Sequence, residues 1–314
     1  MKTVMSARLN TPLSENRVSY GLVKRRLLDA IGDTPLMDVS GSNTRLRVRI
    51  LAKAEFMNPG GSIKDRTACQ IIKDGIKTGK LDRSKILIDS TSGNTGIAYS
   101  MICASLGLRA ELVVPGNINT VKRKIMEAFG AKLILSDPLE GSEGAHRLAQ
   151  RIYERSPERY FFGNQYGNNS NFFAHYNFTG TEILKQTKGK LTHFVAAFGT
   201  GGTIFGVGKR LKNFNPEIKV ICVQPDDDFH GIEGLRYVRE LKTNSIYVES
   251  VIDEVIHVKT EDAYKAQRLL AKETGIFVGF SSGASFFVAS QIASSLKKGL
   301  VVTIFPDRGD RYLS

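Results

Sequence analysis

Cysteine is scarce in this chain, with three residues among 314. The number is odd, and Cys69, Cys103 and Cys222 do not follow the close spacing of metal ligands. The sequence therefore argues against a disulfide framework and against a zinc site. We expect the three side chains to be small buried hydrophobic residues.

Long hydrophobic runs are also missing. No apolar run approaches the roughly 20 residues that a membrane-spanning helix needs. The segment from Met1 to Tyr20 is polar and mixed, without the hydrophobic core of a signal peptide. We expect a flexible N-terminal segment over residues 1–20, no membrane association and a cytoplasmic location.

Acidic residues are outnumbered, with 31 acidic against 44 basic side chains and a net charge of +13. The basic residues are spread along the chain, and the only early cluster is the short run from Lys24 to Arg26. This distribution indicates a solvated basic surface rather than nucleic-acid binding. Attraction of anionic small molecules stays open. The length and the 41% apolar content are those of a globular protein of one or two domains.

From Arg47 onward, short apolar runs alternate with stretches of helical periodicity. Strands are predicted at residues 48–54, 85–89, 109–114, 132–135, 193–197, 219–224 and 300–305. Helices are predicted at residues 65–78, 95–106, 120–129, 143–154, 177–186, 203–213, 261–273 and 285–296. This alternation is typical of parallel sheets covered by helices on both faces. Because a second series begins near Tyr160, we expect two α/β domains with a cleft between them.

Ligands of such sheets bind beyond the carboxyl ends of the strands, where four loops carry candidate residues. The first, NPGGSIKDR at residues 58–66, places Lys64 at the start of a helix. The positive end of the helix dipole disfavours the charged amine there. A lowered lysine pKa is what a Schiff-base nucleophile needs. The same segment also fits a turn with a solvated surface lysine.

The second loop, STSGNTG at residues 90–96, combines hydroxyls and an amide with the N–H groups of a helix start. It forms a pocket for a carboxylate and has more polar side chains than a helix cap needs. The third loop, GTGGT at residues 199–203, lets the backbone approach a phosphate but has neither Walker nor Rossmann spacing. The fourth, GFSSGA at residues 279–284, is explained by helix capping alone.

In their combination and order, these loops resemble the tryptophan-synthase-like (fold type II) pyridoxal-phosphate enzymes, and within them the cysteine synthase family. The resemblance runs from IGDTPL at residues 31–36 to DRGDRYLS at residues 307–314. It implies an α/β fold of two three-layer domains with mostly parallel sheets. A smaller mobile domain would span residues 46–160. A larger domain of residues 21–45 and 161–314 would hold the cofactor phosphate.

The resemblance also implies a role for each loop. Lys64 would carry pyridoxal 5'-phosphate as a Schiff base and act as base and acid at the α-carbon of the substrate. Asn94 would bind the ring hydroxyl of the cofactor, and Ser281 would face its pyridine nitrogen. The cofactor phosphate would be cradled by Gly199, Thr200, Gly201, Gly202 and Thr203. The substrate carboxylate would be held by Thr91, Ser92, Thr95 and Gln165.

A neutral serine at the pyridine nitrogen makes the ring a weaker electron sink than a carboxylate would. Expulsion of a group from the β-carbon is then favoured over transamination. The reaction implied is β-replacement, in which O-acetylserine or O-phosphoserine reacts with sulfide to give L-cysteine. The resemblance further implies a homodimer and closing of the smaller domain over the substrate.

The motif GIEGLRY at residues 231–237 and the DRGDRYLS ending look most like the B-type cysteine synthases. Gly231 and Arg236 are therefore expected at the substrate. In related O-phosphoserine-using enzymes an arginine of this loop recognises the leaving phosphate, and the guanidinium suits that contact. Arg236 fits a surface or interface residue equally well, so both serine esters stay open as substrates.

Two departures keep other activities open. Ser90 replaces a common proline, and a serine there also occurs in enzymes that join O-phosphoserine to glutamate for siderophores. The chain ends at Ser314 without the regulatory extension of animal-type cystathionine β-synthases, and no haem-ligand pattern is evident. The alternatives are a synthase using glutamate or homocysteine, a cysteine desulfhydrase, and a catalytically silent binding protein. No metal site is expected, since the histidines lack metal spacing: His146, His175, His193, His230 and His257. These are expected to be structural or surface residues.

Overall fold

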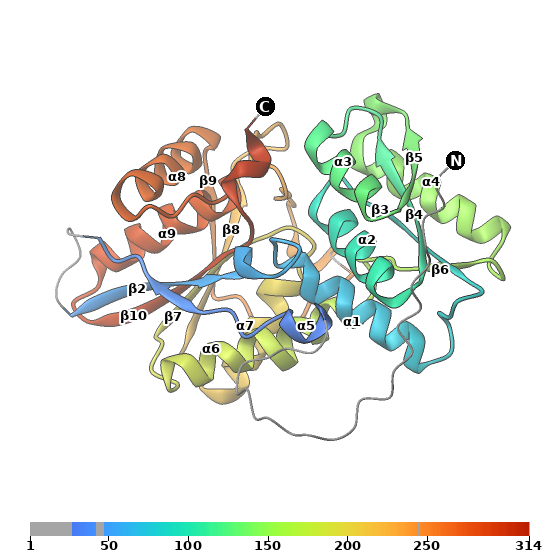
Figure 1. The fold of residues 1–314 in the computed structure, drawn as a ribbon. Helices are drawn as coiled ribbons and strands as arrows, with labels where there is room; N and C mark the ends of the chain where they lie inside the picture. Colours follow the sequence, from blue (N-terminus) through green and yellow to red (C-terminus); the bar gives the residue numbers. More distant parts are fainter. Residues whose placement is uncertain (1–26, 42–46, 244, 314) are drawn as a thin grey trace, which may run out of the picture.

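The computed structural model describes residues 27–41, 47–243 and 245–313 of the chain. Two separate sheets form two lobes that lie side by side in Figure 1. We call them the larger lobe, built on six strands, and the smaller lobe, built on four. The flexible segment predicted over residues 1–20 lies outside the described residues.

The sheet of the larger lobe has the strand order β1-β2-β10-β7-β8-β9, and only β1 runs antiparallel to its neighbour. Its strands are β1 (Leu36–Asp38), β2 (Val48–Ala54), β7 (His193–Ala197), β8 (Lys219–Pro225), β9 (Glu254–Val258) and β10 (Gly299–Phe305). Helix α9 (Phe280–Ser295) covers one face and α8 (Thr260–Thr274) packs on α9. The other face is covered by α7 (Gly202–Phe214) with α6 (Gly180–Thr187) beside it.

The sheet of the smaller lobe is entirely parallel, in the order β5-β4-β3-β6. Its strands are β3 (Ile86–Ser90), β4 (Arg109–Pro115), β5 (Lys132–Ser136) and β6 (Tyr160–Phe162). Helix α4 (Gly141–Arg155) packs on one face. The other face is covered by α1 (Lys64–Lys77), α2 (Asn94–Leu106) and α3 (Thr120–Ala128).

Apolar residues on both faces of the strands explain why helices cover both sides. Along β7, Val195 enters one buried core while Phe194 and Ala196 enter the other. Along β3, Leu87 packs toward α1 and α2, whereas Ile86 and Ile88 pack toward α4. Side chains of a strand alternate between faces, so a continuous apolar run requires cover on each. The predicted fold class, α/β with mostly parallel sheets covered by helices on both faces, is confirmed.

One predicted boundary has to be corrected. Placing the smaller domain at residues 46–160 assigns β2 to it, but β2 pairs with β10 and β1 in the larger lobe. Sheet order differs from chain order here, because the chain leaves β2 through α1 to build the smaller sheet and returns later. The apolar pattern of a strand carries no information on its partner. The rest of the division, and the mobility of the smaller domain, stay predictions.

The predicted strands and helices form, with ends that shift by a few residues. The short or exposed elements were not predicted from the sequence: β1, β6, β9 and α5 (Asn169–Ala174). The sequence prediction also began α9 too late and overlooked a π-helical turn, His175–Thr179, before α6. Among the described helices, none has both the length and the apolarity to cross a bilayer. The three cysteines are free and buried, as predicted.

Candidate active site

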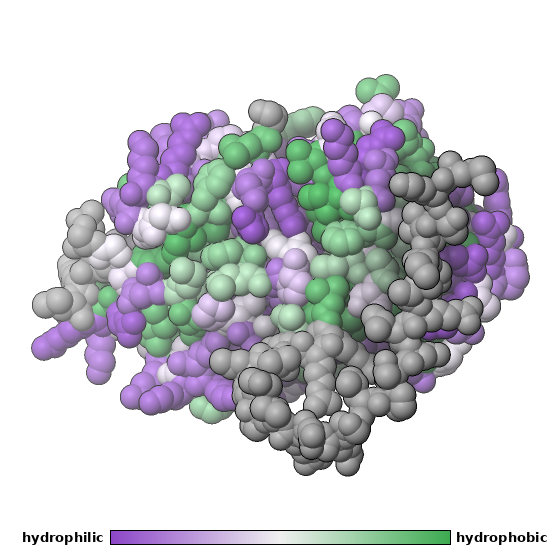
Figure 2. All heavy atoms as spheres, in the orientation of Figure 1, coloured by the Kyte–Doolittle hydropathy of each residue, from purple (hydrophilic) through white to green (hydrophobic). Residues whose placement is uncertain are grey.

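A cleft of about 910 Å³ lies between the two lobes. It collects most of the predicted site residues, namely Lys64, Thr91, Ser92, Asn94, Thr95, Gln165, Gly199, Thr200 and Arg236. A smaller cavity of about 60 Å³ shares part of this lining and adds Gly201, Thr203 and Ser281. Figure 2 shows hydrophilic side chains gathered between the lobes, in the upper centre of the view.

Lys64 is the first residue of α1 and lines both cavities. The alternative interpretation, that it is a solvated surface lysine, is therefore excluded. Burial lowers the pKa of its amine to about 8, and the nearby Asp307 carboxylate opposes that shift. A substantial fraction of the amine is therefore neutral near pH 8. A neutral amine is the nucleophilic form that attacks a carbonyl.

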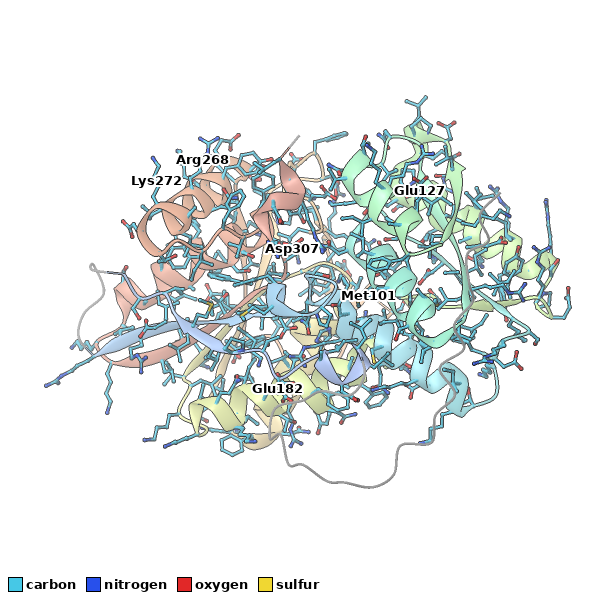
Figure 3. The ribbon with its side chains drawn as sticks, in the orientation of Figure 1. Met101, Glu127, Glu182, Arg268, Lys272 and Asp307 are labelled. Atoms are coloured by element: carbon cyan, nitrogen blue, oxygen red, sulfur yellow. The ribbon has the colours of Figure 1, made fainter. Side chains whose placement is uncertain are left out.

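The first turn of α1 is fixed by a buried ion-pair network below Lys64. Arg66 donates to Glu55 at 2.7 Å and to Glu182 of α6 at 2.6 Å. Lys53, fully buried in β2, donates to the same Glu182 at 2.6 Å. Figure 3 shows Glu182 on α6, below Asp307 in the view. This network ties the helix that carries Lys64 to the larger lobe.

Asn94, the first residue of α2, forms hydrogen bonds with the segment that follows β10. Its amide donates to Asp307 at 2.6 Å, and its carbonyl oxygen accepts from Arg311 at 2.5 Å. Tyr312 also donates to Asp307, whose other carboxylate oxygen is buried with no described partner. Burial raises the pKa of Asp307. Figure 3 places Asp307 between the lobes.

The loop between β3 and α2 is organised by its own side chains. Thr91 accepts from the N–H groups of Gly93 at 3.1 Å and Gly96 at 3.0 Å. Thr95 donates to the side-chain oxygen of Gln165 at 2.7 Å, and Gln165 donates to the Ser90 carbonyl at 3.1 Å. These bonds hold the predicted carboxylate-binding residues on one surface at the N-terminus of α2.

The glycine loop between β7 and α7 forms a tight cradle. Gly201 has φ +91°, a conformation that favours glycine. A Cβ on Gly199 would lie 2.6 Å from the Gly234 carbonyl oxygen, and one on Gly202 would lie 2.1 Å from Asn171. This close packing requires glycine at both positions and fixes the loop, and the backbone N–H groups at the N-terminus of α7 fit a phosphate.

Ser281 lies in the first turn of α9, buried beside the smaller cavity. Lys64, Asn94, the glycine cradle and Ser281 thus surround one space, and this donor set fits a phosphorylated ring aldehyde. Two predicted residues line neither cavity. Gly202 packs against Asn171, and Gly231 accepts a hydrogen bond from the Tyr264 hydroxyl at 2.8 Å.

The outer part of the cleft is charged. Arg236 is exposed there, with its guanidinium 5.3 Å from the centre of the Tyr166 ring. His146 lies against the same ring and contacts the Ser90 hydroxyl at 3.3 Å. Burial lowers the pKa of His146, and the charge of Arg236 lowers it further. Ser90, noted above as a departure, therefore contacts the wall of the cleft.

Three residues in or next to the site were not predicted from the sequence: Asp307, Lys122, which pairs with Glu233 of the cleft lining, and Asn171, which packs against Gly202. Asp307 stands in the DRGDRYLS ending, so that motif was a usable signal for it. Lys122 and Asn171 belong to helices whose packing the sequence does not reveal. Among the described residues there is no group of histidine, cysteine and acidic side chains that could hold a metal.

Comparisons with known proteins agree with this geometry. Residues 27–307 match the family described as pyridoxal-phosphate dependent enzyme. The chain is 47% identical over 309 residues to a cysteine synthase of Aquifex aeolicus, covering 96% of this chain and 94% of that protein. It is 38% identical over 288 residues to cysteine synthase B of Escherichia coli, covering 92% and 94%.

Solved structures give the same result. A cysteine synthase structure from Entamoeba histolytica aligns with TM-score 0.88 and 35% identity, covering 97% of this chain and 93% of that one. An O-acetylserine dependent cystathionine beta-synthase from Helicobacter pylori aligns with TM-score 0.86 and 36% identity, covering 93% and 98%. The chain belongs to the pyridoxal-phosphate dependent enzymes, within their cysteine synthase group.

Proposed function

We propose that this protein is a pyridoxal-phosphate dependent cysteine synthase, which joins an O-activated L-serine to sulfide by β-replacement. The observation that carries the proposal is Lys64, whose pKa is lowered to about 8 where the carboxylate-binding loop, the glycine cradle and Ser281 converge. The cysteine synthases of similar sequence support the same reaction.

Within this proposal the chain binds its cofactor at the inner end of the cleft. Lys64 would hold the cofactor through its aldehyde, and the glycine cradle of residues 199–203 would bind the phosphate. Asn94 would bind the ring hydroxyl and Ser281 the pyridine nitrogen. When bound, the cofactor withdraws electrons from the α-carbon of the substrate, which makes its proton acidic and the β-substituent labile. Lys64 then moves the proton at the α-carbon.

The substrate carboxylate is assigned to the start of α2. Both described bonds of the Thr91 hydroxyl use its oxygen as acceptor, so its O–H can donate to a carboxylate. Gln165 donates one amide hydrogen to the Ser90 carbonyl oxygen, and its second amide hydrogen can donate to the substrate. Ser92 is exposed toward the cleft, and the helix dipole adds a favourable field. Holding the carboxylate here orients the α-carbon next to Lys64.

The leaving group is assigned to the outer part of the cleft, near Arg236. The guanidinium of Arg236 suits contact with an anionic group, whereas Arg147, the other arginine of the lining, already pairs with Glu140 at 3.1 Å. O-phosphoserine is therefore a candidate substrate together with O-acetylserine. Gly231 was predicted at the substrate, and this role stays a proposal, although Gly231 lines neither cavity.

Closing of the smaller lobe over the substrate is a further part of the proposal. Lys122 of α3, only 1% exposed, pairs with Glu233 of the larger lobe, and its amine lies 4.5 Å from the centre of the Tyr312 ring. Together with the Asn94–Asp307 bond, these contacts join the lobes at the edge of the cleft. The homodimeric state and the cytoplasmic location stay predictions.

A different nucleophile is the second candidate. The cystathionine beta-synthase of similar structure is described as O-acetylserine dependent, at 36% identity. Homocysteine or glutamate in place of sulfide would use the same serine ester and the same Lys64 chemistry. The acceptor has to be identified by assay.

The test measures product formation by the purified enzyme. O-acetylserine and O-phosphoserine are each mixed with sulfide, homocysteine or glutamate, and the amino-acid products are identified by mass spectrometry. The proposal expects L-cysteine with sulfide as the fastest reaction. Cystathionine or a glutamate adduct as the main product would show that homocysteine or glutamate, and not sulfide, is the nucleophile. Reaction of neither serine ester would contradict the proposal altogether.

A further inference from the structure

Helix α5 packs between α1 and α7, the two helices whose first residues are Lys64 and Gly202 (Figure 1). The Asn168 side chain caps α5 by accepting from the Ser170 N–H at 3.0 Å. On the other side, a Cβ on Gly206 of α7 would lie 2.6 Å from the Phe172 carbonyl oxygen. The backbones of α5 and α7 are therefore in close contact, and α5 has little freedom to shift.

Asn171 is the residue of α5 that faces the site, and it is 1% exposed. Its side-chain oxygen accepts from the Thr67 hydroxyl at 2.9 Å. Its amide donates to the Gln165 carbonyl oxygen at 2.9 Å and to the Thr200 hydroxyl at 2.9 Å. Both amide hydrogens and the carbonyl oxygen are thus engaged, the full donor capacity of an asparagine.

The three partners of Asn171 come from three functional segments. Thr67 lies one helical turn after Lys64, Gln165 belongs to the carboxylate-binding residues, and Thr200 belongs to the glycine cradle. Since one rigid amide bonds to all of them, a displacement of one segment changes the hydrogen bonds of the others. The close approach of Gly202, whose Cβ would lie 2.1 Å from the Asn171 oxygen, leaves no room for adjustment.

His175, at the start of the π-helical turn, reinforces this arrangement. Its Nε2 contacts the Thr67 hydroxyl at 3.3 Å and the Thr203 hydroxyl at 3.4 Å. Burial, followed by the charges of Arg66 and Lys64, lowers its pKa well below the usual range. His175 is therefore neutral and holds the same two segments through hydrogen bonds. Irregular π-helical turns are frequent at functional sites.

We infer that Asn171 is a positioning residue that couples the phosphate end of the cofactor site to the carboxylate end of the substrate site. The inference rests on the proposed function, because it takes the roles of the two ends from it. A change at Asn171 loosens both ends together, whereas a residue that belongs to one end affects that end alone. Serine or alanine at this position cannot reach three partners, and aspartate cannot donate.

The test compares Asn171→Ala and Asn171→Ser with wild-type holoenzyme. The phosphate end is followed by the phosphorus NMR signal of the bound cofactor and by its rate of loss on dialysis. The carboxylate end is followed by the dissociation constant for L-serine, which lacks a good leaving group. We expect both variants to lose cofactor faster and to bind L-serine more weakly, each by roughly tenfold to a hundredfold.

Ser170→Ala is the matched control on the same helix. The Ser170 hydroxyl donates to Asp74 of α1 at 2.7 Å and contacts neither end of the site. We expect this variant to match wild type in both measurements. Gln165→Ala serves as the single-end control and should weaken L-serine binding while the phosphorus signal stays in place.

The outcomes separate this inference from the proposed function. If wild-type protein retains cofactor and binds L-serine but Asn171→Ala and Asn171→Ser change only one end or neither, the coupling is wrong. If wild-type protein itself retains no cofactor, the proposed function is wrong. Should Asn171→Ala fail to fold, as judged by circular dichroism, Asn171→Ser carries the test.

Discussion

The inner and outer ends of the cleft are built differently. At the inner end, Lys64, the glycine cradle and Ser281 start helices, and close backbone contacts fix their positions. At the outer end, Arg236 is exposed and reaches the Tyr166 ring through a flexible side chain. Under the proposed function, we expect the inner end to determine which reaction occurs and the outer end to determine which substrates are used.

Among the changes considered, removal of the Lys64 side chain should lower the catalytic rate most. Lys64→Ala loses both the nucleophilic amine and the proton carrier, so we expect kcat to fall by roughly a thousandfold or more. Steady-state cysteine formation measures the loss. Lys77→Ala, an exposed lysine on the same helix, is the control and should keep wild-type activity.

Removal of Arg236 should separate the two ends most clearly. Arg236→Ala is expected to lower kcat/KM for O-phosphoserine by roughly tenfold to a hundredfold, the range for a lost hydrogen bond to a charged group. The value for O-acetylserine should change little, because its leaving group is neutral when bound. Arg236→Lys should restore only part of the loss. Equal losses for both esters would assign Arg236 to structure rather than to the leaving group.

The rate of cofactor binding should depend on pH through the titration of Lys64 at the inner end of the cleft. Since the pKa of Lys64 is lowered from 10.5 to about 8, its neutral fraction rises with pH and levels off above that value. The rate at which cofactor-free protein takes up pyridoxal phosphate should follow the same curve. Asp307→Asn removes the negative charge that raises this pKa, so the midpoint should move to lower pH. A midpoint that moves upward would show that Asp307 does not face the amine.

The smallest effect is expected from the ion pair between the lobes. Lys122→Met and Glu233→Gln each remove one partner of a pair that is buried on the lysine side only. We expect the dissociation constant for L-serine to rise roughly threefold to tenfold in each variant. The exchanged pair, Lys122→Glu with Glu233→Lys, should recover much of the affinity. Strictly additive effects in the double variant Lys122→Met/Glu233→Gln would mean that the two residues act independently.

The loops of the inner end could be recognised in the sequence because the residues within each loop are consecutive. The loops of residues 58–66, 90–96 and 199–203 each combine a strand end, polar or glycine residues and a helix start, which a single sequence displays. The strand and helix series followed for the same reason. What these patterns lack is information on which strands become neighbours, and β2 was therefore placed in the wrong lobe.

The outer end and the supporting contacts could not be predicted in the same way. Lys122 and Glu233 are far apart in sequence and meet only through the packing of the two lobes. Asn171 lies on a helix of six residues that lacks a clear apolar period, so α5 itself was missed. Asp307 was visible in the C-terminal motif, but its contact with Asn94 depends on the full fold.

The central claim is that the amine of Lys64 carries the cofactor. The most direct measurement is borohydride reduction of the purified protein, followed by proteolysis and mass spectrometry of the lysine-containing peptides. We expect one added phosphopyridoxyl group, located on Lys64. A protein that carries no such group, or carries it on a different lysine, would contradict the claim.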